Sequence, residues 1–266
     1  MTQFCLQLFN PSKQLRPLIR NYWRLESPAA GFTSRHDFMA IDGGSGWLFV
    51  LDGEVTFHTG KCAYGSFSDA STLHSNYLIG AEQAKAIGIR FKPGAQSLFC
   101  RRPTWHEGQD HVPLELANID SRKLCQTLKS TSIWSEQASM LDSWLIDCLA
   151  THSHGNKNIL PVVESIVKAQ APLSSEELSS ISGMSQRQLQ RYFITKVGMI
   201  PRNLGVVCRA NSSLDYMKTS KAKAIIDIAL ECGYHDQAHM ARDFRRLFGK
   251  PPSHFLQTFS PSSECI

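Results

Sequence analysis

Two short segments of the chain carry glutamine and arginine side chains at spacings that would group them on one face of a helix. They are residues 186–191, QRQLQR, and residues 237–245, QAHMARDFR. Glutamine can pair with the edge of adenine and arginine with the edge of guanine, and arginine also neutralises phosphates. Small residues such as Ala238 and Ala241 let a helix approach a groove closely. These residue types predict a surface that binds double-stranded DNA.

The two segments belong to an internal repeat. Each copy has a short helical segment, a glycine, a polar residue suited to cap a helix, and a second helical segment that ends at Gly-x-x-Pro. Two copies are too few for a solenoid, so we expect two modules that do the same job side by side. At a spacing of 51 residues, the aligned pairs are Gln186 and Gln237, Arg191 and Arg242, Phe193 and Phe244, Gly198 and Gly249, and Pro201 and Pro252.

Apolar spacing indicates how each second helix is oriented. Leu189, Phe193 and Val197 are four residues apart, so they share the inward side of a helix. Met240, Phe244 and Phe248 form the matching predicted stripe of the second copy. Ser185 and Asp236 precede these helices and are typical N-cap residues. A helix, a turn at glycine and a second helix form the outline of a helix–turn–helix, whose second helix enters the major groove.

A plain helical domain with a solvated basic face is the alternative interpretation. The charge distribution favours DNA, because residues 1–155 contain 14 basic and 14 acidic residues whereas residues 156–266 contain 14 and 9. A basic excess in one half points to a polyanionic partner. The repetition of cap, glycine and apolar spacing also favours DNA over a solvated face. A longer helix, predicted at about 202–218, would join the two copies.

The N-terminal half has a different pattern. Short aromatic and aliphatic runs, such as GWLFVLDGEVTF, alternate with turn residues over the first 110 residues and predict a small β-barrel or cupin-like domain. Residues 120–150 predict a helix whose apolar stripe either covers this sheet or binds a second copy of the chain. We therefore predict an α+β protein with two domains. They are a β-rich domain with flanking helices at 1–154 and an all-α domain of two helix–turn–helix units at 155–260.

Sequence motifs for catalysis are absent. The chain has no GxSxG, HExxH, phosphate loop or paired-carboxylate motif, and its eight cysteines show no CxxC spacing. We expect no enzyme activity, no cofactor and no metal. Cys100, which lies beside Arg101 and Arg102, is the candidate for a redox-sensing thiol. The sequence has no long apolar run and no signal-like N-terminus, so we expect a cytoplasmic protein that does not engage a membrane.

The C-terminal part resembles a known family. The stretches IIDIALECGYHDQAHMARDFRRLFGKPPSHF at 225–255 and MSQRQLQRYFITKVGMIPRNL are similar to the DNA-binding domain of bacterial AraC/XylS-type transcription regulators. The resemblance covers about 160–258. It implies two reading helices in successive major grooves on one face of DNA, and RNA polymerase as a further partner. The base-facing residues that it implies are Gln186, Arg187, Gln190, Gln237, Ala238 and Ala241, with Arg191, His239, Arg242 and Arg245 on phosphates or in mixed contacts.

The N-terminal half resembles the sheet domain of one subset of these regulators, through NYWRLE, the Asp42–Gly43 turn and IGIRFKPGA. Such domains bind a small-molecule effector, form a homodimer, or both. Trp47, Tyr77 and Arg90 are our candidate effector-binding residues; alternatively, Trp47 and Tyr77 are only core and Arg90 is a surface charge.

We predict a sequence-specific transcription regulator that acts as an activator. The alternatives are a DNA-targeted enzyme or repair-type protein that uses the module as a guide, and a constitutive regulator without a ligand.

Overall fold

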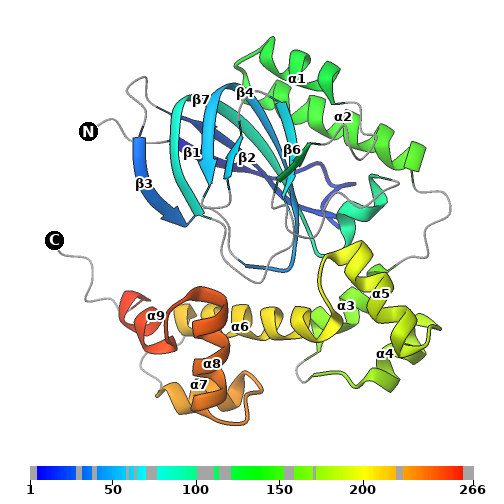
Figure 1. Ribbon diagram of the computed structural model, residues 1–266, viewed down its shortest axis with the longest axis vertical. Coiled ribbons are helices and arrows are strands. Elements are labelled where there is room, and N and C mark those ends of the chain that lie inside the picture. Colours follow the sequence, from blue (N-terminus) through cyan, green and yellow to red (C-terminus); the bar gives the residue numbers. More distant parts are fainter. Residues whose placement is uncertain are drawn as a thin grey trace.

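A computed structural model of the chain shows an N-terminal sheet domain and a C-terminal helical region (Figure 1). This confirms the mixed α+β prediction. No helix among the described residues is long and apolar enough to cross a membrane. The predicted domain boundary at 154/155 lies outside the described residues. The structure describes residues 5–27, 32–37, 41–57, 60–62, 65–69, 77–100, 111–113, 121–152, 159–169, 172–219 and 224–259.

One antiparallel sheet is built around two long strands, β4 and β7. The strand order is β1-β2-β7-β4-β6-β8, while β3 also pairs with β7 and β5 with β4. Along one edge, β4 therefore pairs with both β5 and β6, and β7 pairs with both β2 and β3. Register shifts in β4 and β7 lie where the pairing partner changes. The strands are β1 (Cys5–Phe9), β2 (Ile19–Glu26), β3 (Phe32–Asp37), β4 (Gly46–Phe57), β5 (Gly60–Cys62), β6 (Gly65–Asp69), β7 (Tyr77–Phe91) and β8 (His111–Pro113).

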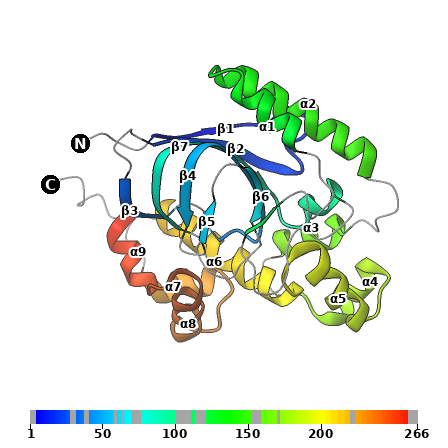
Figure 2. The same ribbon diagram turned by 45° about the horizontal axis from the view of Figure 1, so that its top comes forward.

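The sheet is curved but not closed in the described part of the chain (Figure 2). No pairing joins β1 to β8 there, so the predicted small β-barrel or cupin-like form of this domain is not confirmed. Closure would require hydrogen bonds between the two end strands, and the alternating pattern that we used predicts strands without specifying which of them pair. The coarser prediction, an antiparallel sheet with flanking helices, is confirmed.

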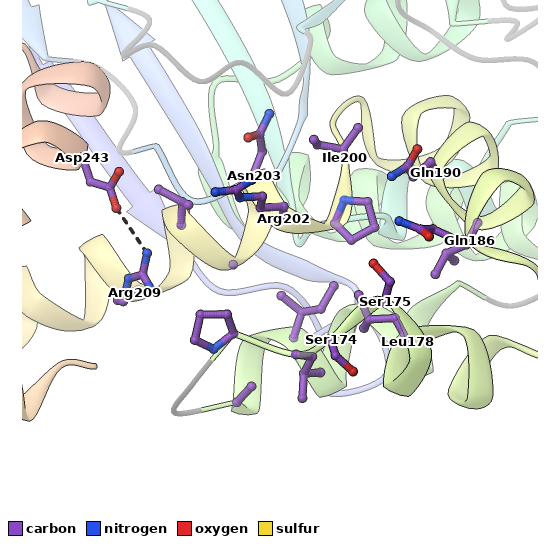
Figure 3. A pocket seen from close by; sticks show the side chains of 18 of the residues that line it. Ser174, Ser175, Leu178, Gln186, Gln190, Ile200, Arg202, Asn203, Arg209 and Asp243 are labelled. Carbon is purple, nitrogen blue, oxygen red and sulfur yellow. Dashed lines mark hydrogen bonds and ion pairs between the residues drawn. The ribbon is translucent and has the colours of Figure 1, made fainter. Parts of the chain in front are cut away.

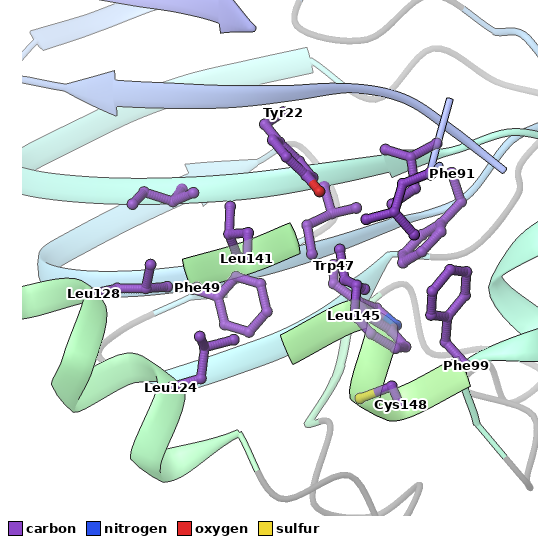
Figure 4. Packing of buried hydrophobic residues seen from close by; sticks show 14 of the residues in the cluster. Tyr22, Trp47, Phe49, Phe91, Phe99, Leu124, Leu128, Leu141, Leu145 and Cys148 are labelled. Atoms are coloured by element: carbon purple, nitrogen blue, oxygen red, sulfur yellow. The ribbon is translucent and has the colours of Figure 1, made fainter. Parts of the chain in front are cut away.

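Alternate residues of β2, β4 and β7 fill the two faces of the sheet. Trp47 and Phe49 lie on one face with Tyr22, and this face packs against α1 (Arg122–Lys129) and α2 (Trp134–His152) (Figure 4). Leu141 and Leu145 of α2 are fully buried there, as expected if this helix covers its own sheet. The opposite face carries a second apolar cluster, which consists of Trp23, Leu25, Leu48, Val50, Val55, Phe57, Cys62, Ala81, Ala84 and Ala86.

The second helix of each copy begins and ends at its predicted signals. Ser174 and Ser185 each form a capping box, and the Asp236 side chain accepts a hydrogen bond from the His239 backbone N–H at 2.6 Å. Gly198 ends the second helix of the first copy. The helices are α3 (Leu160–Lys168), α4 (Ser175–Ser182), α5 (Gln186–Val197), α6 (Pro201–Thr219), α7 (Ile225–Glu231), α8 (Gln237–Phe248) and α9 (Pro252–Phe259).

Each helix–turn–helix unit has its own apolar core. In the first unit, Phe193 of α5 is fully buried among residues of α3, α4 and α6. In the second unit, Phe244 of α8 is fully buried among residues of α6, α7 and α9. Leu247 is buried beside it and Phe248 only partly, so the inward stripe is shifted slightly from the predicted one. Helix α6 contributes to both cores and connects the units (Figure 1).

The sheet domain packs directly on both units. Ile41 belongs to the apolar core of the second unit, and its backbone carbonyl accepts a hydrogen bond from the Asn211 side chain on α6. Beside it, Gly43 has a φ of 72°, and a Cβ added there would lie 2.4 Å from Leu204 of α6. Gly94, which precedes the short 3₁₀ helix η1 (Ala95–Leu98), lies against residues of α3 and α5. The two domains therefore form a continuous structure in this arrangement.

Candidate nucleic-acid interface

Helix α5 presents its polar residues to solvent. Leu189 and Val197 are buried, which turns the opposite side of the helix outward. All four predicted DNA-facing residues of this helix are exposed, as required for contact with DNA. They are Gln186, Arg187, Gln190 and Arg191.

Helix α8 presents a similar face. Met240 and Phe244 are fully buried, and Tyr234 is 3% exposed in the preceding turn. Gln237, Ala238, Arg242 and Arg245 are exposed, and His239 and Ala241 are half-buried at the margins of that face. Both units thus place glutamine, arginine and small residues on an outward helix surface, which has the composition of a base-reading surface.

An ion pair links α6 to α8. The Arg209 guanidinium lies 3.3 Å from the Asp243 carboxylate and 4.5 Å from the centroid of the Tyr234 ring. His239 Nε2 lies 3.7 Å from the same carboxylate. The side chains of Arg209 and Asp243 are only 11% and 13% exposed, so solvent screens this pair weakly. The contact holds α8, the predicted DNA-facing helix of the second unit, against the connecting helix α6.

A groove of about 720 Å³ separates the first unit from α8. Helix α6 forms its floor, the start of α4 and of α5 form one wall, and α8 forms the other (Figure 3). Gln186 and Gln190 lie on the first wall, and Arg246 on the second. We call this cavity the inter-unit groove. Arg202 and Asn203 on its floor were not predicted, because they stand at the start of a connecting helix and carry no repeat signal.

Two of the three candidate effector residues, Trp47 and Arg90, do not come together. Residue 46 pairs with Arg90, and Trp47 pairs with Ile89. Adjacent residues in a strand point to opposite faces, so Trp47 and Arg90 lie on opposite faces of the sheet. Trp47 is 1% exposed and packs edge-on against Phe91 and Trp144, with ring centroids 4.8 and 5.5 Å away. Tyr77 begins β7, where its backbone pairs with Asp37.

Arg90 is buried and pairs with Asp42, which lies in the turn through which the sheet domain contacts α6. Its guanidinium donates to the Asp42 carboxylate, and Arg20 Nε lies 2.8 Å from the same carboxylate. Burial opposes ionisation of Asp42, but the two guanidinium groups outweigh it and hold the pKa of Asp42 below its ordinary value. The Gly44 backbone N–H donates a further 2.8 Å hydrogen bond to this carboxylate. Arg90 is therefore a buried ion-pair partner, and the alternative interpretation of Arg90 as a surface charge is wrong.

Cys100 does not have the environment of a reactive thiol. It is 2% exposed, and burial raises its pKa to about 12. A reactive thiol needs exposure and a lowered pKa, so the redox interpretation of this residue is not supported. Across the described ranges, no three histidine, cysteine, aspartate or glutamate side chains gather as a metal site.

Two known families match the chain. Residues 178–258 match the family described as a helix-turn-helix domain, which spans both units described above. Residues 7–113 match a domain of unknown function, DUF6597, which covers the sheet. The second match gives the N-terminal domain a family without giving it an activity.

Individual relatives match mainly the helical region. The HTH-type transcriptional regulator ArgR of Pseudomonas aeruginosa is 30% identical over 100 residues, which are 34% of this chain and 30% of that protein. An uncharacterized HTH-type transcriptional regulator of Haemophilus influenzae is 29% identical over 85 residues, or 32% of this chain and 28% of that protein. The chain thus covers less than a third of the length of these curated relatives.

Solved structures of this class are also similar. A probable AraC family transcriptional regulator from Rhodopseudomonas palustris is 28% identical, with 39% of this chain and 97% of that chain covered and a TM-score of 0.37. ToxT from Vibrio cholerae is 10% identical over 96% of this chain and 98% of that chain, with a TM-score of 0.45.

The paired units and the family match define a protein with two helix–turn–helix units. Within that class, residues 178–258 match the helix-turn-helix domain family, and the curated relatives that the chain resembles are HTH-type transcriptional regulators.

Proposed function

We propose that the chain is a sequence-specific DNA-binding transcription regulator, acting as an activator. The observation that carries this proposal is the pair of exposed glutamine and arginine faces on α5 and α8, each supported by its own core. Helix α6 has 19 residues and is about 28 Å long at 1.5 Å per residue, a length that suits reading helices placed about one helical turn of DNA apart. Double-stranded DNA at a promoter is the proposed partner.

The N-terminal domain is proposed to regulate this binding. Its two turns at Ile41–Gly43 and Gly94 contact both DNA-binding units, so a change in the sheet domain can alter their relative placement. We propose that this domain is barrel-like, binds a small-molecule effector or forms a homodimer, and that RNA polymerase is a further partner. In this role the protein is cytoplasmic and not an enzyme. Trp47, Tyr77 and Arg90 remain the proposed effector residues, although Trp47 and Arg90 lie on different faces.

A constitutive regulator is the second candidate. Apolar clusters occupy both faces of the described part of the sheet, and Trp47 and Trp23 are almost fully buried in them. Such packing suits a domain that acts through its contacts with the DNA-binding units rather than through a ligand. The two candidates differ in whether any small molecule changes the affinity for DNA.

Fluorescence anisotropy with the DNA next to the chain's own gene tests the proposal. We expect tight binding that random-sequence competitor DNA does not displace and that weakens as salt rises, because arginine–phosphate contacts release counterions. A second experiment selects DNA sequences from a random library with the full chain. If random DNA competes equally well against the DNA next to the gene and against the selected sequences, sequence-specific regulation is contradicted. An effector screen with the same assay separates the two candidates.

Replacing Gln190 by alanine should weaken preference at a single base pair. A glutamine that pairs with adenine contributes about 1–3 kcal/mol of discrimination, so we expect roughly a 5- to 150-fold loss on the selected sequence and little change on random DNA. Gln126→Ala is the matched control, because Gln126 is an exposed glutamine on α1 in the sheet domain. Equal losses on both DNAs would remove Gln190 from the base-reading residues.

A further inference from the structure

The inter-unit groove lies between the two proposed DNA-reading helices, yet base reading does not require it. Its first wall carries Gln186 and Gln190 of α5 (Figure 3). His239 and Arg246 of α8 line its second wall. Its floor is the first part of α6, including Arg202 and Asn203. Residues that reach DNA bases therefore stand at the margins of the groove, while its floor lies between them.

The groove is cationic. Arg202 and Arg246 are both exposed and come from different helices. Arg246 donates a hydrogen bond to the Asn203 side-chain oxygen at 3.4 Å, which brings this arginine to the floor formed by α6. Asp243 is the acidic residue among those that line the groove in the described part of the chain, and Arg209 neutralises it at 3.3 Å. The remaining charge of the lining is positive.

The geometry of two reading helices places DNA backbone across this groove. When two helices enter successive major grooves on one face of B-DNA, the minor groove between them faces the protein. The sugar–phosphate strands that border this minor groove must then pass between α5 and α8. We propose that the inter-unit groove binds this DNA backbone, with Arg202 and Arg246 on its phosphates and Asn203 orienting Arg246. This inference rests on the proposed DNA-binding function and adds a binding site to it.

A small anionic molecule is the competing occupant. A volume of about 720 Å³ falls within the range of small-molecule sites, which is roughly 300–1,000 Å³. The flanking positions of Gln186 and Gln190 favour the DNA backbone, because a duplex held by these residues covers the groove. The two occupants differ in one measurable quantity, the salt dependence of DNA binding.

The first test compares two double variants of equal charge change. Arg202→Gln with Arg246→Gln removes both groove charges, and Arg122→Gln with Lys123→Gln removes two exposed charges from α1 of the sheet domain. On the DNA sequence selected by the wild-type chain, two lost phosphate contacts should reduce the slope of log affinity against log salt by about 1.8. Between 50 and 200 mM salt, the groove variant should therefore lose roughly tenfold less affinity than wild type.

Three controls complete this comparison. The groove variant should lose similar affinity on selected and random DNA, because phosphates carry no sequence information. The variant Arg202→Lys with Arg246→Lys should keep most of the slope, because the charges remain. Circular dichroism and thermal unfolding should match wild type for all variants, since these side chains are exposed.

The second test removes the charge from the DNA instead. Methylphosphonate linkages, which are neutral, replace the phosphates between the two contacted major grooves. Wild type and the α1 control should bind this DNA more weakly than unmodified DNA. The groove variant, which already lacks the two charges, should bind both DNAs with nearly the same affinity.

The outcomes separate the two proposals. A wild-type chain that selects no sequence contradicts the proposed function. The proposed function stands if the wild-type chain selects a sequence. The backbone site alone is overturned if the groove variant then keeps the full salt slope, or if it loses as much affinity as wild type on DNA with neutral linkages.

Discussion

Replacing Asp42 by alanine is expected to destabilise the sheet domain by about 3–5 kcal/mol. The side chains of Asp42 and Arg90 are only 7% and 10% exposed, and the change leaves the buried guanidinium without its carboxylate. It also removes the acceptor for the Gly44 backbone N–H, in the turn whose Ile41 carbonyl binds Asn211 of α6. We therefore expect both a lower unfolding temperature and weaker contact between the domains.

Tryptophan fluorescence measures this effect selectively. All five tryptophans lie before residue 150, so their emission follows unfolding of the N-terminal half. Asp52→Ala is the matched control, because Asp52 is an exposed aspartate in the same sheet. Its substitution should change stability by less than about 0.5 kcal/mol. An equally small effect of Asp42→Ala would contradict the prediction, because it would show that water solvates Arg20 and Arg90 when the carboxylate is absent.

The contribution of Asp42 should depend on pH in a defined direction. Its pKa is lowered in the folded chain, so the folded state binds fewer protons there than the unfolded state, whose aspartate pKa is about 3.9. The stabilisation is therefore complete above about pH 5 and is lost as the pH falls through the lower, folded-state pKa. The difference between wild type and Asp42→Ala should shrink steadily below about pH 4.

Replacing Phe244 by alanine is expected to cost about 3–5 kcal/mol and to unfold the second helix–turn–helix unit before the first. Phe244 is fully buried, and its ring contacts those of Phe248 and Phe255, with centroids 5.2 and 5.8 Å away. Because this core is distinct from the core around Phe193, the cavity should weaken mainly its own unit. Hydrogen exchange should show loss of amide protection over α7, α8 and α9.

The repeat supplies the control. Phe193→Ala removes the aligned residue of the first unit, which is also fully buried, and should expose the amides of α4 and α5 instead. On DNA, each variant should lose protection of the half-site read by its own unit. Loss of amide protection across both units in both variants would show that α6 joins them into one cooperative core.

Much of the helix–turn–helix region was predictable from sequence because its determinants are local. Caps such as Ser185 and Asp236 act on backbone groups three residues away, and the stripe of Leu189, Phe193 and Val197 follows from the helical period. Once the inward side of α5 is known, the outward positions of Arg187 and Arg191 follow. The repeat then extended the same reasoning to α8.

The sites that depend on distant segments required the tertiary structure. Asp42 and Arg90 lie 48 residues apart and meet through strand register, which also decides that Trp47 and Arg90 occupy opposite faces. A pattern of alternating residues predicts a strand but not its partners, and a shift of one residue exchanges the two faces.

The inter-unit groove likewise has no local signal, since Asn203 and Arg246 meet only when α8 packs on α6. The sequence by itself determined the two helix–turn–helix units and their outward polar faces, through interactions within a few residues. Only the tertiary structure decided how the sheet domain contacts these units and what lies between them, because those contacts join side chains that no short-range periodicity relates.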